Sequence, residues 1–318
     1  MIHHVFACKS NIGDWLSARG IQTLLSPWPI AEYLCDEPFV PATLARLAEA
    51  DVHDVIVVGG GGLFMDYFAP FWEGLVAISQ RVPVCLWGVG YCDGKRSSSR
   101  ASVDVLRRIV GASHLVVVRD WLSHREFADL RLPEPIGCPS TLMLRPSTMP
   151  ARGLLHVVHY DVVGPSTYEE IDRAARAFAS RSGRPYQQTD NQIRDGDEEE
   201  LTDRLARYAA ADLVLTSRLH GCIIALAMGR KVLAVSGDWK IEAFMNSVGL
   251  GMWALEPDEL NRLGERLEAL PSQPSVQDRI EQIRQANRSV AGEILRLAER
   301  GQSACHCAKP MFARSAHE

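Results

Sequence analysis

An arginine and a histidine stand two positions apart in the sequence SRLHG, as Arg218 and His220. The planar guanidinium of an arginine suits a phosphate or a carboxylate. A histidine can carry or release a proton near neutral pH. Lys240, farther along the chain, is expected to bring another positive charge to the same place. These residue types predict a site that binds a small anion and transfers a proton.

The elements around this sequence are expected to place it at the edge of a sheet. Asp212–Thr216 is an apolar run that predicts a buried strand, and Lys231–Ser236 predicts a second one. Between them, Ser217 is predicted to cap a helix that Gly229 ends. A strand, a helix and a strand in this order form the unit of parallel α/β sheets.

The first turn of that helix is the expected ligand site, because ligands in open α/β sheets bind beyond the carboxyl ends of the strands. A helix start also offers free backbone N–H groups and a positive dipole end, so it attracts anions. Leu219 and Gly221 belong to this turn, together with Arg218 and His220. A purely structural alternative stays open, in which the motif caps the helix, Arg218 pairs with a carboxylate and His220 is packed.

The composition of the 318-residue chain excludes several classes of protein. A net charge of −5 argues against a general nucleic-acid binder. The sequence has no uninterrupted apolar stretch of about 18 residues that would predict a membrane span, and its first residues, MIHHVFACKS, lack the pattern of a signal peptide. Eight scattered cysteines are typical of a reducing cytoplasm, where we expect the protein to act.

Cys305-His306-Cys307, near the end of the chain, is a short run of residues that bind metals. It lacks a second ligand pair at a familiar spacing, so a disordered tail is the better interpretation. No metal site is expected elsewhere in the chain.

The turn after the first predicted strand, His3–Cys8, carries a second candidate. It contains Asn11, Gly13 and Asp14, and the helix Trp15–Leu25 is predicted to follow. Asp14 either caps that helix or lines the cleft, because the turn again lies beyond the carboxyl end of a strand. The residues alone leave both interpretations open.

Four consecutive glycines, residues 59–62, follow the predicted strand Asp54–Val58. Such a run lets the backbone pass very close to a ligand or to a neighbouring element. The dinucleotide-binding pattern G-x-G-x-x-G is not completed, because Met65 stands at the place of the last glycine.

Arg119 directly follows another predicted strand, His114–Val118. Its place at a strand end, in line with the other candidates, favours a contact with ligand. An ion pair with Asp120 or another neighbouring carboxylate explains it equally well, and position alone does not decide.

A proline-rich segment, Pro133–Pro150, is the predicted boundary between two domains. We expect an N-terminal Rossmann-like domain over residues 1–145, a C-terminal one over residues 151–300, and a disordered tail over residues 301–318. In both halves strands alternate with helices, and special residues follow the strands. The predicted fold is therefore α/β, with two Rossmann-like domains that face each other across a cleft.

Five motifs occur between about residue 8 and about residue 250. They are Asn11-Ile12-Gly13-Asp14, Val57-Val58-Gly59-Gly60-Gly61, Leu86-Trp87-Gly88-Val89-Gly90, Val118-Arg119-Asp120 and Ser217-Arg218-Leu219-His220-Gly221 with Lys240 downstream. Together, and in this order, they resemble the motifs of the polysaccharide pyruvyl transferase family. The resemblance implies a GT-B-like architecture with phosphoenolpyruvate as the donor, a sugar as the acceptor and no cofactor.

The implied reaction forms a pyruvate ketal on two hydroxyls of a bacterial exopolysaccharide or cell-surface glycan and releases phosphate. The donor side is expected in the C-terminal domain and the acceptor side in the N-terminal domain. His220 is the hypothetical general acid, or else a phosphate ligand that protonates the leaving group, and Asp14 contacts or deprotonates the acceptor. The expected phosphoenolpyruvate contacts are Arg218, Leu219, Gly221, Lys240 and Arg119, and the expected cleft-lining residues are Asn11, Gly13, Gly60, Gly61 and Ser217.

Two rival functions stay open at this point. A nucleotide-sugar glycosyltransferase on the same architecture would need a ribose-binding carboxylate, for which Glu242 is the candidate. A non-catalytic anion-binding protein would bind without releasing phosphate. Neither the acceptor sugar nor the oligomeric state follows from the sequence. A lipid-linked acceptor would place the enzyme at the inner face of the membrane.

Overall fold

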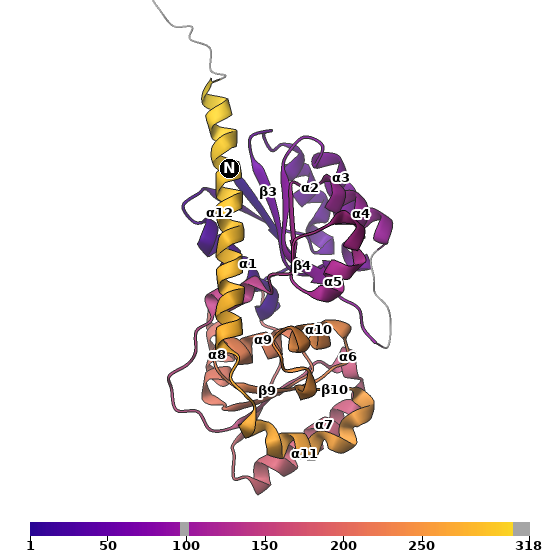
Figure 1. Cartoon of the computed structure of the whole chain (residues 1–318), viewed down its shortest axis with the longest axis vertical. Helices are drawn as coiled ribbons and strands as arrows, with labels where there is room; N and C mark the ends of the chain where they lie inside the picture. The colour runs from indigo at the N-terminus through magenta and orange to yellow at the C-terminus, as the bar shows by residue number, and fades with distance from the viewer. Residues whose placement is uncertain (96–101, 308–318) are drawn as a thin grey trace, which may run out of the picture.

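The computed structural model describes residues 1–95 and 102–307, and these residues form two five-stranded sheets, each covered by helices (Figure 1). All strand pairs in both sheets are parallel. The predicted architecture of two Rossmann-like domains is confirmed. The first sheet has the order β2-β1-β3-β4-β5, with β1 Ile2–Phe6, β2 Ile30–Leu34, β3 Val55–Phe64, β4 Val84–Tyr91 and β5 Leu115–Val118.

The second sheet repeats the topology of the first. Its order, from β7 to β10, is β7-β6-β8-β9-β10, so the first strand of each domain lies between its second and third strands. In such doubly wound sheets the strand order reverses between the first and the third strand of the domain, and ligands bind at that point. Its strands are β6 Leu154–Val157, β7 Tyr186–Thr189, β8 Leu213–Thr216, β9 Lys231–Val235 and β10 Ala254–Leu255.

The helices up to α10 lie between successive strands, as parallel pairing requires, and α11 and α12 follow the last strand. In the first domain they are α1 Ile12–Leu25, α2 Val40–Ala48, α3 Ala69–Ile78, α4 Val103–Ala112 and α5 Trp121–Glu126. In the second half of the chain they are α6 Tyr160–Val163, α7 Pro165–Arg181, α8 Glu198–Ala210, α9 Leu219–Ala227, α10 Trp239–Ser247, α11 Leu263–Ala269 and α12 Gln277–Cys307.

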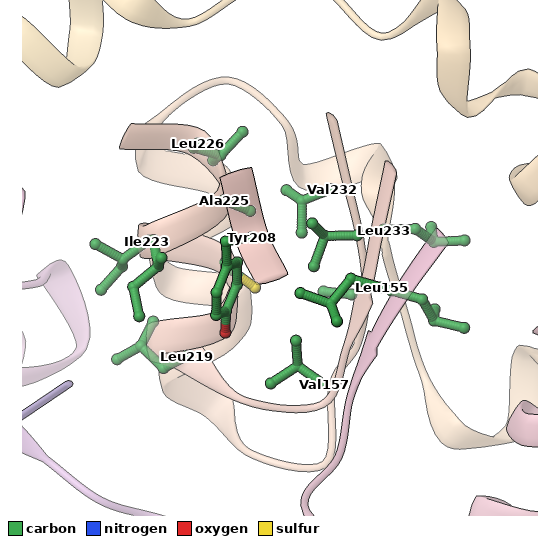
Figure 2. Packing of buried hydrophobic residues seen from close by; sticks show 14 of the residues in the cluster. Leu155, Val157, Tyr208, Leu219, Ile223, Ala225, Leu226, Val232 and Leu233 are labelled. Carbon is green, nitrogen blue, oxygen red and sulfur yellow. The ribbon is translucent and has the colours of Figure 1, made fainter. Parts of the chain in front are cut away.

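The unit β8-α9-β9 has the strand–helix–strand structure that the sequence predicts. All nine residues of α9 are buried, which explains why this stretch is apolar on every side. Figure 2 shows this core, with α9 on one side, Val232 and Leu233 of β9 on the other, and Tyr208 of α8 between them. Gly229 follows the helix with a φ of 77°, a left-handed conformation that suits glycine and ends the helix as predicted.

The predicted capping role of Ser217 is wrong. The N-cap residue of α9 is Arg218, and its side chain makes no capping hydrogen bond. Ser217 Oγ instead accepts a hydrogen bond of 2.9 Å from the backbone N–H of His159. This bond ties the end of β8 to the end of β6, so Ser217 shapes the strand ends rather than the helix start.

The last helix, α12, belongs to both domains, which the sequence did not indicate. It begins beside the second sheet and runs along the first domain (Figure 1), where Val290 and Ile294 pack into a core with Ile2 and Val57. Its buried Asn287 accepts a hydrogen bond of 2.8 Å from Trp87 Nε1. Burial of this apolar stripe explains why the chain returns to the first sheet.

The helix α12 also continues farther than the sequence predicts. Disorder was expected from residue 301, but the helix runs to Cys307 and therefore includes Cys305-His306-Cys307. Gly301 lies against the backbone of His53, which holds this end of the helix to the first domain. The rest of the predicted tail, residues 308–318, lies outside the described residues. Among the described helices, none is both long and apolar enough to cross a membrane.

Candidate active site

A cavity of about 310 Å³ lies where the switch points of the two sheets face each other. Both domains contribute to it, which is typical of ligand sites between domains. From the first domain come Ala7, Cys8, Ser10, Asn11, Asp14, Asp36, Gly62, Leu63, Met65, Tyr67, Phe68, Cys92 and Arg119. From the second half come His159, Asn191, Gln192, Ser217, Arg218, Leu219, His220, Asp238, Lys240 and Ile241.

Backbone hydrogen bonds hold the two domains together at one rim of this cavity. The N–H of Ile12 donates to the carbonyl of Asn191 at 2.9 Å, and the N–H of Ile193 donates to the carbonyl of Ser10 at 2.9 Å. Asn191 is itself fixed, because its side chain accepts a hydrogen bond of 2.9 Å from Tyr208. The start of α1 therefore keeps a defined position relative to the second sheet.

Asp14 lines the cavity and does not cap α1, which decides between the two interpretations of the sequence. Asn11 is the cap, since its side chain accepts a hydrogen bond of 3.0 Å from the N–H of Gly13. Asp14 is left to face the cavity from the first turn of the helix. Burial raises the pKa of its carboxyl to about 6, although Arg119 and Lys240 pull in the opposite direction.

His220 reaches the same cavity from the first turn of α9 and is only 9% exposed. Its Nε2 lies 3.6 Å from the Cys138 sulfur, which fixes one side of the ring. Burial, with the positive charges of Arg119, Lys240 and Arg218, lowers the pKa of the imidazole to about 3. With these protein groups alone around it, the imidazole is neutral at pH 7.

Gly13 leaves the space that the imidazole ring of His220 occupies. A Cβ atom at this position would overlap Cγ and Nδ1 of His220, so only glycine leaves room for the ring. Gly13 thus belongs to the site by packing under the ring and does not line the cavity.

Replacing Gly13 by alanine is expected to lower turnover at least about tenfold, because the methyl group displaces the imidazole from its position. The measurement is kcat together with the melting temperature. Gly111→Ala is the matched control, since a Cβ there meets nothing within 4 Å and the residue also lies in a helix, α4. Equal kcat values for the two variants would contradict the placement of His220.

Three cationic side chains line the cavity around His220: Arg218, Lys240 and Arg119. Arg218 is anchored through Nε, which donates a 2.6 Å hydrogen bond to the carbonyl of Val158. Lys240 lies in the first turn of α10, 2.7 Å from the carboxylate of Asp238 and 2.9 Å from the Cys92 sulfur. Burial alone would lower the pKa of Lys240, but Cys92 and Asp238 raise it, so the side chain stays charged.

Arg119 forms the ion pair that one interpretation predicts, and its contact with a ligand stays a prediction. It pairs with Asp120 at 3.1 Å, it donates a 3.1 Å hydrogen bond to the carbonyl of Tyr91, and it also lines the cavity. The pair with Asp120 holds the guanidinium in place beyond the end of β5, because Asp120 in turn caps α5 through Ser123. The first domain therefore presents one fixed positive charge to the second.

Besides Gly13, three more glycines that the sequence assigned to the cleft or to the donor do not line the cavity: Gly60, Gly61 and Gly221. Gly221 packs α9 onto β8, since a Cβ there would overlap the Thr216 hydroxyl. Gly61 supports Asp14, because a Cβ there would lie 2.8 Å from the Asp14 carboxylate and the φ of Gly61 is 112°. Gly60 packs between α1 and Pro139. These glycines position the site without lining it.

Several lining residues were not predicted, among them Gly62, Asp36, Tyr67 and His159. Asp36 and His159 each follow a strand, β2 and β6, so the strand-end rule that found Asp14 would have found them if both strands had been placed correctly. Within residues 1–95 and 102–307, no group of three or more His, Cys, Asp or Glu side chains is arranged to hold a metal ion.

Comparison with solved structures assigns the architecture. The UDP-GlcNAc 2-epimerase of Neisseria meningitidis is 10% identical, with a TM-score of 0.56 over 93% of this chain and 99% of that one. The Methanocaldococcus jannaschii UDP-GlcNAc 2-epimerase is 10% identical, with a TM-score of 0.53 over 89% and 98%. The glycotransferase of kitacinnamycin is 14% identical, with a TM-score of 0.50 over 93% and 98%. At these identities the likeness concerns the fold, which is GT-B-like.

Sequence comparison assigns the family. The comparison with curated proteins found no match. A family model described as polysaccharide pyruvyl transferase matches residues 11–238, which run from the cap of α1 to the residue that caps α10 and include Asp14, Arg119, Arg218 and His220. The match covers most of the chain, and the protein belongs to the polysaccharide pyruvyl transferase family.

Proposed function

We propose that this protein transfers the pyruvyl unit of phosphoenolpyruvate onto two hydroxyls of one sugar and releases phosphate. The main support is the convergence of Arg218, Lys240 and Arg119 with Asp14 and His220 in one cavity between the domains. Phosphoenolpyruvate carries a carboxylate and a phosphate on a small carbon frame, so it needs several fixed cations close together. A family that transfers pyruvyl groups supplies the reaction type.

The donor binds against the second domain. The guanidinium of Arg218 and the first backbone N–H groups of α9 hold one acidic group, and Lys240 holds the other. Arg119 completes the charge balance from the first domain. Charge-assisted hydrogen bonds of this kind contribute about 1.5–3 kcal/mol each. Three cations match the three negative charges of the fully ionised donor.

Binding of the donor changes the protonation of His220. Burial first, and then the three cations, hold the imidazole neutral. The donor's negative charges offset the effect of the cations, so the pKa of His220 rises when the donor enters. His220 then gives its proton to the methylene carbon, which becomes the methyl group. A sugar hydroxyl adds to the adjacent carbon as Asp14 accepts its proton. In the protein without donor the pKa of this carboxyl is about 6, so Asp14 is mostly ionised at neutral pH when the substrates enter.

A second hydroxyl of the same sugar displaces phosphate and closes the ring. Of the two hydroxyl protons, one replaces the proton that reached the methyl carbon, and the other leaves on hydrogen phosphate. The charge is balanced, since the trianionic donor becomes a ketal carboxylate and a phosphate dianion. No external oxidant or cofactor takes part in these steps. We place the reaction in the cytoplasm, at the inner face of the membrane if the acceptor is lipid-linked.

The rival nucleotide-sugar glycosyltransferase loses its candidate carboxylate. Glu242 pairs with Lys95, accepts a 2.9 Å hydrogen bond from Ser236 and does not line the cavity. A ribose hydroxyl would have to displace these partners. The described residues therefore favour the small doubly acidic donor over a nucleotide sugar.

The deciding experiment measures phosphate release from phosphoenolpyruvate with pyranosides that offer 4,6- or 3,4-hydroxyl pairs. The proposal predicts sugar-dependent phosphate release and a product heavier than the sugar by one pyruvate ketal. A thermal-shift comparison of phosphoenolpyruvate with nucleotide sugars is run in parallel. Stabilisation by a nucleotide sugar alone supports a glycosyltransferase, and stabilisation by phosphoenolpyruvate without phosphate release supports a non-catalytic binder.

Arg218→Lys is expected to raise the KM for phosphoenolpyruvate about tenfold and to change kcat less. Lysine keeps the charge but loses the planar fork, and it cannot bind the donor and the Val158 carbonyl together. Steady-state kinetics with varied donor measures both constants. Arg173→Lys, at an exposed arginine of α7, is the control. An unchanged KM in Arg218→Lys argues against a direct contact with the donor.

A further inference from the structure

Part of the cavity wall that the first domain contributes is aromatic and acidic. Tyr67 and Asp36 both line the cavity from the first domain, whereas Arg218 and Lys240 line it from the second. If the donor occupies the cationic side, as the proposed function requires, the acceptor is left with the side that Tyr67 and Asp36 form. The inference that follows rests on that function.

Tyr67 has contacts on one side and leaves part of its ring in solvent. It lies in a single 3₁₀ turn, Asp66–Phe68, and its side chain is 42% exposed. The neighbouring Phe68 is buried and packs edge-on against Tyr67, with ring centroids 5.0 Å apart. The Tyr67 hydroxyl also accepts a 3.3 Å hydrogen bond from the backbone N–H of Glu37. An aromatic face that stays partly in solvent is a platform for an apolar ring face.

Asp36 places a carboxylate beside this platform. It stands at the N-cap position of the 3₁₀ helix Glu37–Phe39, yet its side chain makes no capping hydrogen bond. The Tyr67 hydroxyl bonds to it instead. Burial raises the pKa of the Asp36 carboxyl, the hydrogen bond from Tyr67 lowers it, and the charge of Asp195 adds to the rise. Such a carboxylate gains from hydroxyl donors and repels a second carboxylate.

We propose that Tyr67 and Asp36 form the acceptor subsite, on which the ring of an uncharged pyranose stacks while its hydroxyls donate to the carboxylate. The C–H face of a pyranose is apolar and its rim is hydroxylated, which matches a ring beside an acceptor-only group. Asp14 lines the same cavity and is therefore within the same compartment as the bound hydroxyls. The subsite selects against sugars that carry a carboxylate, because the carboxylate of Asp36 repels a second one.

The first test compares three variants at saturating phosphoenolpyruvate. Tyr67→Ala is expected to weaken the binding of methyl pyranosides about tenfold, measured as acceptor KM and by saturation-transfer NMR. Tyr67→Phe keeps the ring. On a logarithmic scale, its loss of acceptor affinity is expected to be less than half of the loss in Tyr67→Ala. Trp121→Ala is the matched control, because Trp121 is 43% exposed and does not line the cavity. Equal acceptor binding in Tyr67→Ala and Trp121→Ala overturns the proposal.

The second test addresses the carboxylate. Methyl glucopyranoside and methyl glucuronide differ by a carboxylate and are compared for binding by saturation-transfer NMR. The native protein is expected to prefer the uncharged sugar at least about fivefold, and Asp36→Asn is expected to reduce that preference to within about twofold. A preference that Asp36→Asn leaves unchanged, or a native preference for the glucuronide, contradicts the role of Asp36.

Donor binding separates failure of this inference from failure of the proposed function. Phosphoenolpyruvate affinity, measured by titration calorimetry, is expected to be the same in Tyr67→Ala and the native protein. If the donor binds and phosphate is released, but the Tyr67 variants bind sugars normally, only the acceptor subsite is wrong. If the native protein binds sugars through Tyr67 but does not bind phosphoenolpyruvate, the donor assignment is wrong and the sugar subsite remains.

Discussion

Asp14→Asn is expected to lower turnover by about 10²- to 10⁴-fold, because asparagine cannot accept the proton of the attacking hydroxyl. Its size and its place in the first turn of α1 are preserved, so the cavity keeps its shape. The measurement is kcat for phosphate release, with Asp203→Asn, at an exposed aspartate of α8, as the control. Turnover of Asp14→Asn close to that of the control would remove Asp14 from the mechanism.

The same variant is expected to be more stable than the native protein at neutral pH. Burial raises the pKa of Asp14 from 3.8 to about 6, so the folded state favours the protonated form. The stability that this proton contributes is fully present below pH 4 and is lost as the pH rises through 6. Above pH 7 the native protein therefore bears a cost of up to about 3 kcal/mol that asparagine does not.

Denaturation at several pH values checks this expectation. The two proteins should unfold at similar denaturant concentrations near pH 4, and the variant should gain from pH 4 to pH 7. A gain in stability combined with a loss of activity is the pattern expected of a residue kept for chemistry at the expense of folding. A variant that is less stable than the native protein at pH 7 would mean that the carboxylate is needed as a partner of Arg119 and Lys240.

The sequence predicts the central part of this fold because local patterns determine it. The unit β8-α9-β9 is apolar throughout, and such runs occur where both faces of an element are covered. Polar or half-exposed elements were missed. The strand β7, Tyr186–Thr189, has the sequence YQQT and lies at the edge of its sheet, so no apolar alternation marks it. The return of α12 depends on packing against a sheet far away in the sequence.

The sequence likewise identified only part of the candidate site. Residues that directly follow a well-marked strand, such as Arg119 and Arg218, were identified from the sequence, because parallel strands bring their carboxyl ends to one edge. The functions of the glycines could not be predicted from the sequence. Gly13 and Gly61 pack against His220 and Asp14, which are close in space but far away in the sequence. Asp36 follows a half-buried edge strand that the sequence did not mark, and Tyr67 lies in a short turn without a pattern.

The pKa values of the two central groups could not be predicted from the sequence either. Both shifts arise from burial first, which the residue types do not encode. A histidine that burial and three cations hold neutral gains the proton of an acid when an anion offsets those cations. The geometry therefore implies an order, in which the donor enters before the proton is transferred, and it links donor binding to proton uptake.

His220→Ala is expected to lower turnover at least about a hundredfold while the fold persists, because the group that protonates the methylene carbon is removed. His220→Gln is the informative companion, since glutamine keeps polar contacts but cannot titrate. Loss of kcat in both variants, with donor affinity preserved in His220→Gln, supports the acid role. A preserved kcat and a raised donor KM in His220→Gln would make the imidazole a phosphate ligand.

Calorimetry in buffers of different ionisation enthalpy adds a separate readout: the native protein should take up protons when phosphoenolpyruvate binds, and His220→Gln should take up fewer. Near-normal turnover of His220→Ala, with the expected melting temperature, would exclude both roles.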